Sequence, residues 1–215
     1  VFAGETYKDD DCALFAPQTL DDNIYDPVDT GLVAKMHKAI TIIQLKLEGQ
    51  LIERHPEWGM AEHSVFGKAD FTDNTVEIGG QKYKLLDMNF PTVYPERPLE
   101  LTDEENELMT VLAYSFMHSD RLNKHIRFLY SKGSMYKTIS GNLLFHGCIP
   151  LDKDGELQSI NIEGRQYSGK AMLDKLDEIA NKAYFMQEGE EKDYAADYLW
   201  YLWCGPCSPL YGKDK

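Results

Sequence analysis

The sequence has few of the features that mark secreted, membrane-spanning or nucleic-acid-binding proteins. Its four cysteines are unevenly spaced and too few for a disulfide framework in 215 residues, which favours a reducing, cytoplasmic setting. No apolar run approaches the ~18 residues that a membrane-spanning helix needs. The 22 Lys and Arg residues form no basic patch among 36 acids, and the formal net charge is -14. We therefore expect the protein to bind neither nucleic acid nor a membrane surface.

The chain opens on "VFAG" without an initiator methionine and ends on "GKDK". This is consistent with a piece of a longer polypeptide, and N-terminal processing would look the same. The hydrophobic content of 43% is ordinary for a folded protein with one large domain or two small ones.

Helical periodicity dominates the first part of the chain. Residues 1–30 are rich in acids and predict loops, whereas residues 32–54 predict a helix that ends before Pro56. The apolar spacing of this helix predicts a buried face made of Met36, Ile40, Ile43, Leu47 and Leu51, with Lys35, Lys38, Lys46 and Glu53 outside it.

Two local signals follow that helix. Gly79-Gly80 lies between two strand-like runs and predicts the turn of a β-hairpin. Thr102 and Glu105 form a capping box, which predicts the start of a second helix. Its expected buried face consists of Leu108, Val111, Leu112, Ser115 and Phe116.

The second half alternates helices with strand-like segments. Residues 121–131 predict a third helix that Gly133 ends, and the short apolar stretch 141–151 predicts a buried strand. A hairpin is expected next, then a helix capped by Ser168 and a last helix from about Glu190 that ends in "YLWYLW". The helix after Ser168 should bury Met172, Leu173, Leu176, Ile179 and Ala183. Together these elements indicate an α/β or α+β fold in which helices dominate.

The stretch "WCGPC", Trp203 to Cys207, spells the active-site motif of thioredoxins. Such a pair works where one thiolate lies at a helix N-terminus and the second thiol lies one turn away. Only eight residues follow Cys207, and they include Pro209 and Gly212, so no helix of useful length fits there. A dithiol redox protein is therefore the less favoured alternative.

The most informative single residue is His146, in "LLFHGCIP". The end of a buried strand is where α/β proteins place ligands and catalytic groups, and neutral imidazole is the commonest metal-binding side chain. A hydrogen-bonded core histidine is the alternative. No two histidines form an H-x-H or H-E-x-x-H pair, so most ligands of a metal at His146 must come from outside this chain.

Two loops resemble ligand-binding motifs. "DKDGE", residues 152–156, matches half of a calcium loop but lacks the later ligands, so a hairpin turn is favoured. "SKGSMYK", residues 131–137, offers glycine, hydroxyls and two lysines to a phosphate, but a helix C-cap followed by a loop is favoured.

Several stretches together resemble one bacterial family. "YSKGSMYKTISGNLLFHGCIPLDKDGE" and "DYLWYLWCGPCSPLYGKDK" are similar to segments of the class III fructose-1,6-bisphosphatases of Firmicutes and Bacteroidetes, and "ERPLELTDEENELM" fits the same family. The resemblance runs along essentially all 215 residues. Because the family's C-terminal segment has the form "LWxGxxSPLFGK", the resemblance implies that Cys204 and Cys207 occupy variable positions.

The resemblance also implies a metal site. These enzymes are calcineurin-like metallophosphoesterases, which bind two metals through the blocks D-x-H, G-D-x-x-D, G-N-H-D/E, a lone His often followed by Gly, and G-H-x-H. His146-Gly147 matches the fourth block. The first three blocks would lie before Val1 and the fifth after Lys215. His146 is thus the implied ligand of a dinuclear Mn²⁺ or Mg²⁺ site, and the isolated chain is expected to be inactive.

The implied reaction is hydrolysis of the sugar bisphosphate fructose 1,6-bisphosphate to fructose 6-phosphate and phosphate in gluconeogenesis. Lys132, Lys137 and Arg165 are the candidate sugar-phosphate contacts. The implied fold is part of a double β-sandwich with flanking helices. Residues 1–100 are expected to be a mainly helical insertion with a small hairpin. Residues 101–151 are expected to return to the core and to include the strand that ends at His146. Residues 152–215 are expected to form a hairpin and a helical segment.

A non-enzymatic reading remains open beside the enzymatic one. The helical apolar stripes and the "YLWYLW" cluster also suit a folding, capping or subunit-contact module, with any activity carried by the rest of a longer protein. Such a module would form a homo-oligomer.

Overall fold

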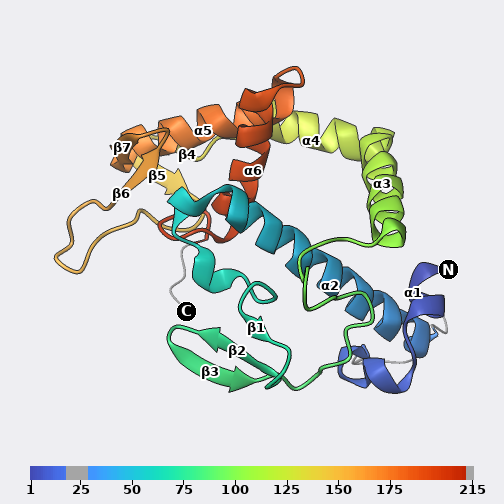
Figure 1. Cartoon of the computed structure of the whole chain (residues 1–215). Coiled ribbons are helices and arrows are strands. Elements are labelled where there is room, and N and C mark those ends of the chain that lie inside the picture. Colours follow the sequence, from blue (N-terminus) through green and yellow to red (C-terminus); the bar gives the residue numbers. More distant parts are fainter. Residues whose placement is uncertain (18–28, 212–215) are drawn as a thin grey trace. The chain divides into compact units, whose positions relative to one another are not determined.

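The computed structural model describes residues 1–17 and 29–211, which form two compact units, Val1–Phe116 and Met117–Lys215 (Figure 1). Each unit combines helices with small antiparallel sheets, which confirms a mixed, helix-rich α+β class. Within the described ranges, no helix is both long enough and apolar enough to cross a membrane.

The first unit begins with helical turns where the sequence predicts loops. Phe2–Thr6 forms helix α1 and Asp10–Phe15 forms the 3-10 helix η1, so the loop prediction is wrong there. Residues 18–28 lie outside the described residues. Phe2–Thr6 and Asp10–Phe15 are ordered by tertiary packing, because Ala3, Tyr7 and Cys12 are buried in the core of the unit.

The remaining elements of the first unit follow in chain order. They are α2 (Thr30–Arg54), the 3-10 helices η2 (Pro56–Trp58) and η3 (Ala61–His63), β1 (Ala69–Asp70), β2 (Thr75–Ile78), β3 (Gln81–Lys84) and α3 (Asp103–Met117). The predicted hairpin is confirmed, since β2 and β3 pair antiparallel around Gly79 and Gly80, whose φ angles are 58° and 76°. Positive φ at both turn residues matches the right-handed twist of the strands.

The buried face of α2 differs from the predicted one. Of the predicted face only Ile43 is buried, whereas Met36 and Ile40 are 55% and 40% exposed. The buried positions are Ala34, Lys38, Ala39, Ile42, Ile43, Lys46, Gly49 and Ile52. The prediction is wrong because it weighed large apolar residues only. Small residues let neighbouring segments approach the helix, and the two lysines find partners from distant parts of the chain.

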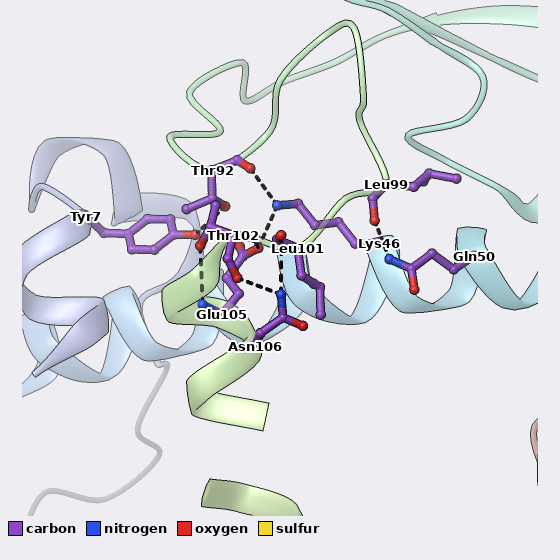
Figure 2. A network of polar contacts seen from close by, with 9 residues as sticks. All are labelled: Tyr7, Lys46, Gln50, Thr92, Leu99, Leu101, Thr102, Glu105 and Asn106. Atoms are coloured by element: carbon purple, nitrogen blue, oxygen red, sulfur yellow. Dashed lines mark hydrogen bonds and ion pairs between the residues drawn. The ribbon is translucent and has the colours of Figure 1, made fainter. Parts of the chain in front are cut away.

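Figure 2 shows the partners of one of these lysines. The Lys46 Nζ donates to the Glu105 Oε2 at 2.7 Å and to the Thr92 carbonyl at 2.5 Å, and both Lys46 and Glu105 are fully buried. Glu105 Oε2 also accepts the Thr102 N–H at 2.9 Å, while Thr102 Oγ1 accepts the Glu105 N–H at 3.2 Å, which confirms the capping box. Nearby, burial raises the pKa of Tyr7 to about 12. The network ties α2 to the start of α3.

The second buried lysine has partners of its own. The Lys38 ammonium lies 2.7 Å from Asp87 Oδ2 and donates to the Asp11 carbonyl at 2.8 Å. It also lies 5.8 Å and 5.9 Å from the ring centroids of Phe15 and Phe90. Charge pairing, a hydrogen bond and two aromatic faces together offset the cost of removing this charge from water.

The face predicted for α3 is not buried, so that prediction is wrong as well. Val111 and Phe116 are 56% and 63% exposed. Leu108 and Leu112 are half-buried and line a groove of about 540 Å³, together with Met36 of α2. The helix is held chiefly at its N-terminal end, through Glu105.

The second unit contains the remaining helices and two hairpins. Its elements are α4 (Asp120–Lys132), β4 (Tyr136–Ile139), β5 (Asn142–Phe145), β6 (Ser159–Ile162), β7 (Arg165–Ser168), α5 (Gly169–Phe185) and α6 (Glu190–Cys204). Gly133 directly follows α4, as predicted. Helix α5 packs against α6 and against the β6–β7 hairpin. The predicted inner face of α5 is confirmed at Met172, Leu173, Leu176 and Ile179, whereas Ala183 is only half-buried.

The aromatic end of α6 is divided between the core and the surface. Tyr198, Tyr201 and Leu202 are buried, while Trp203 is 62% exposed. The ring centroids of Tyr198 and Tyr201 lie 5.0 Å apart. One side of the "YLWYLW" cluster therefore belongs to the core of the second unit.

Candidate functional site

His146 directly follows β5, where the sequence predicts the end of a strand. The strand exists, but its burial was wrongly predicted, since all four residues of β5 are exposed. It pairs only with β4 among the described residues, through a turn at Ser140 and Gly141 with φ angles of 51° and 78°. His146 itself is exposed, which rules out the alternative of a buried core histidine.

His146 is one of the residues that line a cavity of about 670 Å³ in the second unit. The walls come from the end of α4, the loop before β4, and helices α5 and α6. Most lining side chains are apolar, and the polar ones include His146, Ser134, Asp177 and Asn181. A concave, mainly apolar space with a few converging polar groups is the usual form of a ligand site.

The loop between α4 and β4 forms one wall of this cavity and is fastened to α5. The Met135 N–H donates to Asp177 Oδ1 at 3.2 Å, and the Tyr136 hydroxyl donates to Asp174 Oδ1 at 2.9 Å. The Gly133 N–H donates to the Leu129 carbonyl at 2.7 Å. The predicted C-cap and loop are thus confirmed for "SKGSMYK". The Met135 N–H, which could have bound a phosphate, donates to the Asp177 carboxylate instead.

Two of the three candidate phosphate contacts lie together. The Lys137 Nζ donates to the carbonyl of Lys132 at 2.8 Å, which places both lysines at the loop beside the cavity. Arg165 lies opposite Ile162 in the β6–β7 hairpin, a separate element. None of the three lines the cavity that His146 borders.

Asp177 is a functional candidate that sequence reasoning missed. Burial raises the pKa of this carboxyl above its ordinary value, although the Met135 N–H and Lys137 act in the opposite direction. No local sequence signal points to it, because the Met135 N–H that it accepts lies 42 residues away. A carboxyl with a raised pKa in a cavity is a common feature of functional sites.

The raised pKa predicts the effect of Asp177→Asn. The folded state holds the Asp177 proton more tightly than the unfolded state, so ionisation costs stability as the pH rises through the folded pKa. Asparagine keeps the oxygen that accepts the Met135 N–H but carries no charge. The variant is therefore expected to melt at a higher temperature than the wild type at pH 7, with a difference that shrinks toward about pH 4.

Asp174→Asn supplies the matched control, to be measured in the same thermal melts. Lys170, and then the Tyr136 hydroxyl, lower the pKa of Asp174, so neutralising this carboxyl removes a favourable ion pair. Its melting temperature at pH 7 is expected to fall slightly. Equal shifts of the same sign in both variants would show that burial of Asp177 is not the cause.

Two of the other histidines are engaged elsewhere in the first unit. His55 stacks on Trp58 with ring centroids 4.0 Å apart, and His37 Nδ1 lies 3.4 Å from the Phe15 carbonyl. In the part of the chain that the structure describes, no three His, Cys, Asp or Glu side chains gather as a metal site. Among the described residues, His146 is therefore not part of a three-ligand cluster.

The calcium-like segment is a turn, as favoured. Asp152 Oδ1 accepts the N–H groups of Asp154 and Glu156, each at 2.9 Å, and Gly155 has a φ of 83°. The carboxylate that a cation would need instead closes the loop.

The "CGPC" motif lies at the wrong end of a helix for thioredoxin chemistry. Cys204 is the last residue of α6, and Cys207 follows in a turn. The C-terminal end of a helix carries partial negative charge and disfavours a thiolate. Burial, with Cys148 nearby, raises the pKa of the Cys207 thiol. These features oppose the dithiol redox alternative.

Comparison with known proteins agrees with the resemblance that the sequence shows. Residues 1–215 match the Firmicute fructose-1,6-bisphosphatase family. The chain belongs to this family. No solved structure gives a significant match to it.

Curated relatives carry the same family name. The chain is 49% identical to the class 3 fructose-1,6-bisphosphatase of Clostridium botulinum (strain Alaska E43 / Type E3) and 50% identical to that of Clostridium tetani (strain Massachusetts / E88), over 215 residues in each case. It is 48% identical over 216 residues to that of Bacteroides fragilis (strain YCH46). The whole chain is covered in all three, but only 33%, 32% and 32% of the relatives. The chain thus spans about a third of their length.

Proposed function

We propose that this chain is a segment of a metal-dependent fructose-1,6-bisphosphatase, which hydrolyses fructose 1,6-bisphosphate to fructose 6-phosphate and phosphate in gluconeogenesis. The observation that carries the proposal is the match along the whole chain to class 3 fructose-1,6-bisphosphatases about three times as long. The cytoplasm is the proposed location.

The proposed fold of the parent is the calcineurin-like double β-sandwich. The exposed β4–β5 hairpin supports it, because Leu143, Leu144 and Phe145 are 44%, 51% and 42% exposed and successive strand residues point to opposite faces. Apolar residues on both faces are typical of a strand inside a covered sheet, and an isolated hairpin is at best marginally stable in water. Parts of the parent outside this chain are proposed to cover the β4–β5 hairpin.

The proposed roles of the segments follow from the same fold. Residues 1–100 form an insertion. Residues 101–151 belong to the phosphoesterase core and carry His146, and residues 152–215 connect this core to the rest of the parent. The break between the two structural units, at Phe116, falls within the second of these segments.

His146 is the proposed metal ligand. Its imidazole is exposed at the end of a strand, beside the small residue Gly147, so a ring nitrogen is accessible to a metal. A bound pair of Mn²⁺ or Mg²⁺ ions would polarise the phosphoryl oxygens and lower the pKa of the attacking water. Lys132 and Lys137 are proposed to hold substrate phosphate by charge, and Arg165 is a third candidate for that role.

A subunit-contact role is the second candidate function. Exposed apolar side chains on α3, among them Val111, Phe116 and Met117, support it. The two roles are compatible, since α3 can form a contact between copies of the parent while His146 binds the metal.

Phosphate release by purified proteins tests the proposal. The full-length parent with Mn²⁺ is expected to release phosphate from fructose 1,6-bisphosphate and to stop when the metal is chelated. The 215-residue chain alone is expected to release none, because no three potential metal ligands gather among its described residues. Turnover by the isolated chain, or none by the parent, contradicts the proposal. Light scattering on the isolated chain tests the second candidate, which requires self-association.

A further inference from the structure

The segment that follows α6 runs beside the segment that follows β5. The Cys148 N–H donates to the Pro209 carbonyl at 3.0 Å, and the Cys148 Sγ lies 3.8 Å from the Ser208 carbonyl oxygen. Gly147 packs on the same segment so closely that a Cβ there would lie 2.5 Å from the Pro209 oxygen. The two backbones are therefore in direct contact, although they are far apart in the sequence.

Cys207 belongs to this contact, because it directly precedes Ser208. The Cys148 Sγ thus lies 3.8 Å from the carbonyl oxygen of the residue that follows Cys207 in the chain. Both residues are half-buried, so part of each is accessible to a small molecule. The structure holds all four cysteines of the chain as thiols.

The other cysteine of the "CGPC" motif contacts the backbone of its own helix. The Cys204 Sγ lies 3.4 Å from the Trp200 carbonyl, back along its own helix. Two hydrogen bonds hold the turn between Cys204 and Cys207. The Gly205 N–H donates to the Tyr201 carbonyl at 2.6 Å, and the Tyr201 hydroxyl donates to the Pro206 carbonyl. The Cys204 thiol is thus engaged with its own helix, and the turn that leads to Cys207 is held by two hydrogen bonds.

We propose that Cys148 and Cys207 form a redox modification site, which closes to an intramolecular disulfide in preference to the Cys204–Cys207 pair. The oxidant is a small-molecule disulfide. One cysteine sulfur attacks it and releases one thiol, and the second cysteine sulfur then displaces the other thiol from the mixed disulfide. One S–S bond breaks and one forms, the two cysteine protons end on the released thiols, and the protein gives up two electrons to the oxidant.

The disulfide ties the segment after α6 to the segment after His146. It closes a long loop within the second unit, and long closed loops restrict the unfolded chain most. The oxidised chain is therefore expected to melt at a higher temperature than the reduced chain, and a dithiol reductant is expected to reverse the change. Neither step involves a metal ligand, so the disulfide is expected whether or not the parent is a phosphatase.

Disulfide mapping tests the site. The 215-residue chain is incubated with oxidised glutathione, its remaining thiols are blocked with N-ethylmaleimide, and the linked peptides are quantified by mass spectrometry. The Cys148–Cys207 link is expected to exceed the Cys204–Cys207 link at least about tenfold, because the fold raises the effective concentration of one thiol at the other. Cys148→Ser and Cys207→Ser should abolish the linked species, whereas the matched variants Cys12→Ser and Cys204→Ser should keep it.

The same reaction in guanidinium chloride provides the reference. Without the fold, the short Cys204–Cys207 loop closes at the least entropic cost and should dominate. A native chain that shows this same pattern overturns the proposal. So does a native chain that stays reduced at a glutathione disulfide concentration that oxidises the denatured chain.

Discussion

Replacing His146 with alanine is expected to lower the phosphatase turnover of the full-length parent by at least about a hundredfold while leaving it folded. The side chain is exposed at the end of β5, so its removal creates no core cavity and costs little stability. What is lost is one imidazole of the proposed metal pair, and with it the geometry that polarises the phosphate.

Turnover and bound metal should be measured together on the same protein. His125→Ala is the matched control, because His125 is also exposed and lies in α4 of the same unit. If His146 binds metal, added Mn²⁺ should restore part of the activity of His146→Ala and leave His125→Ala unchanged. Near-normal turnover with normal metal content in His146→Ala removes this residue from the metal site.

Local signals in the sequence predicted local structure well. The Thr102–Glu105 capping box, the Gly79-Gly80 turn and the end of α4 at Gly133 all depend on residues within a few positions of one another. Their hydrogen bonds and backbone angles are properties of short segments, so the residue types are sufficient to indicate them.

The burial of whole faces could not be predicted in the same way. Lys46 is buried because its ammonium binds the Thr92 carbonyl and the Glu105 carboxylate, which lie 46 and 59 residues away in the sequence. A charged residue in a helix predicts a solvent-exposed position unless its partner is known, and the partner comes from the tertiary fold. Met36 is exposed for the complementary reason, since no described segment covers its side of α2 completely.

The candidate site shows the same division. The position of His146 after a strand followed from the apolar run and the glycine beside it, but the exposure of that strand did not. Asp177 could not be singled out, because its role depends on the N–H of Met135, which lies 42 residues away. Similarly, "CGPC" indicated a nearby cysteine pair, whereas the fold places the two residues after Cys207 against Cys148.

Replacing Lys46 with methionine is expected to lower the free energy of unfolding of the first unit by about 3 to 5 kcal/mol. The change leaves the Glu105 carboxylate buried without its ammonium partner, and the Glu105 Oε1 already has no hydrogen-bond partner among the described residues. Arg97→Met is the matched control, because it breaks an ion pair with Glu100 whose side chains are 70% and 52% exposed. That control should cost less than about 1 kcal/mol.

The double variant Lys46→Met/Glu105→Leu distinguishes the cost of leaving one buried charge unpaired from the cost of losing the ion pair itself. Removing both charges should recover most of the loss, because an apolar pair of similar volume needs no compensation for buried charge. About 1 kcal/mol should remain lost, since the Thr102 N–H no longer has the Glu105 oxygen that accepts it. Urea unfolding, with hydrogen exchange of the α2 amides to localise the effect, measures each step. If Lys46→Met costs no more than Arg97→Met, the buried pair does not fasten α3 to α2.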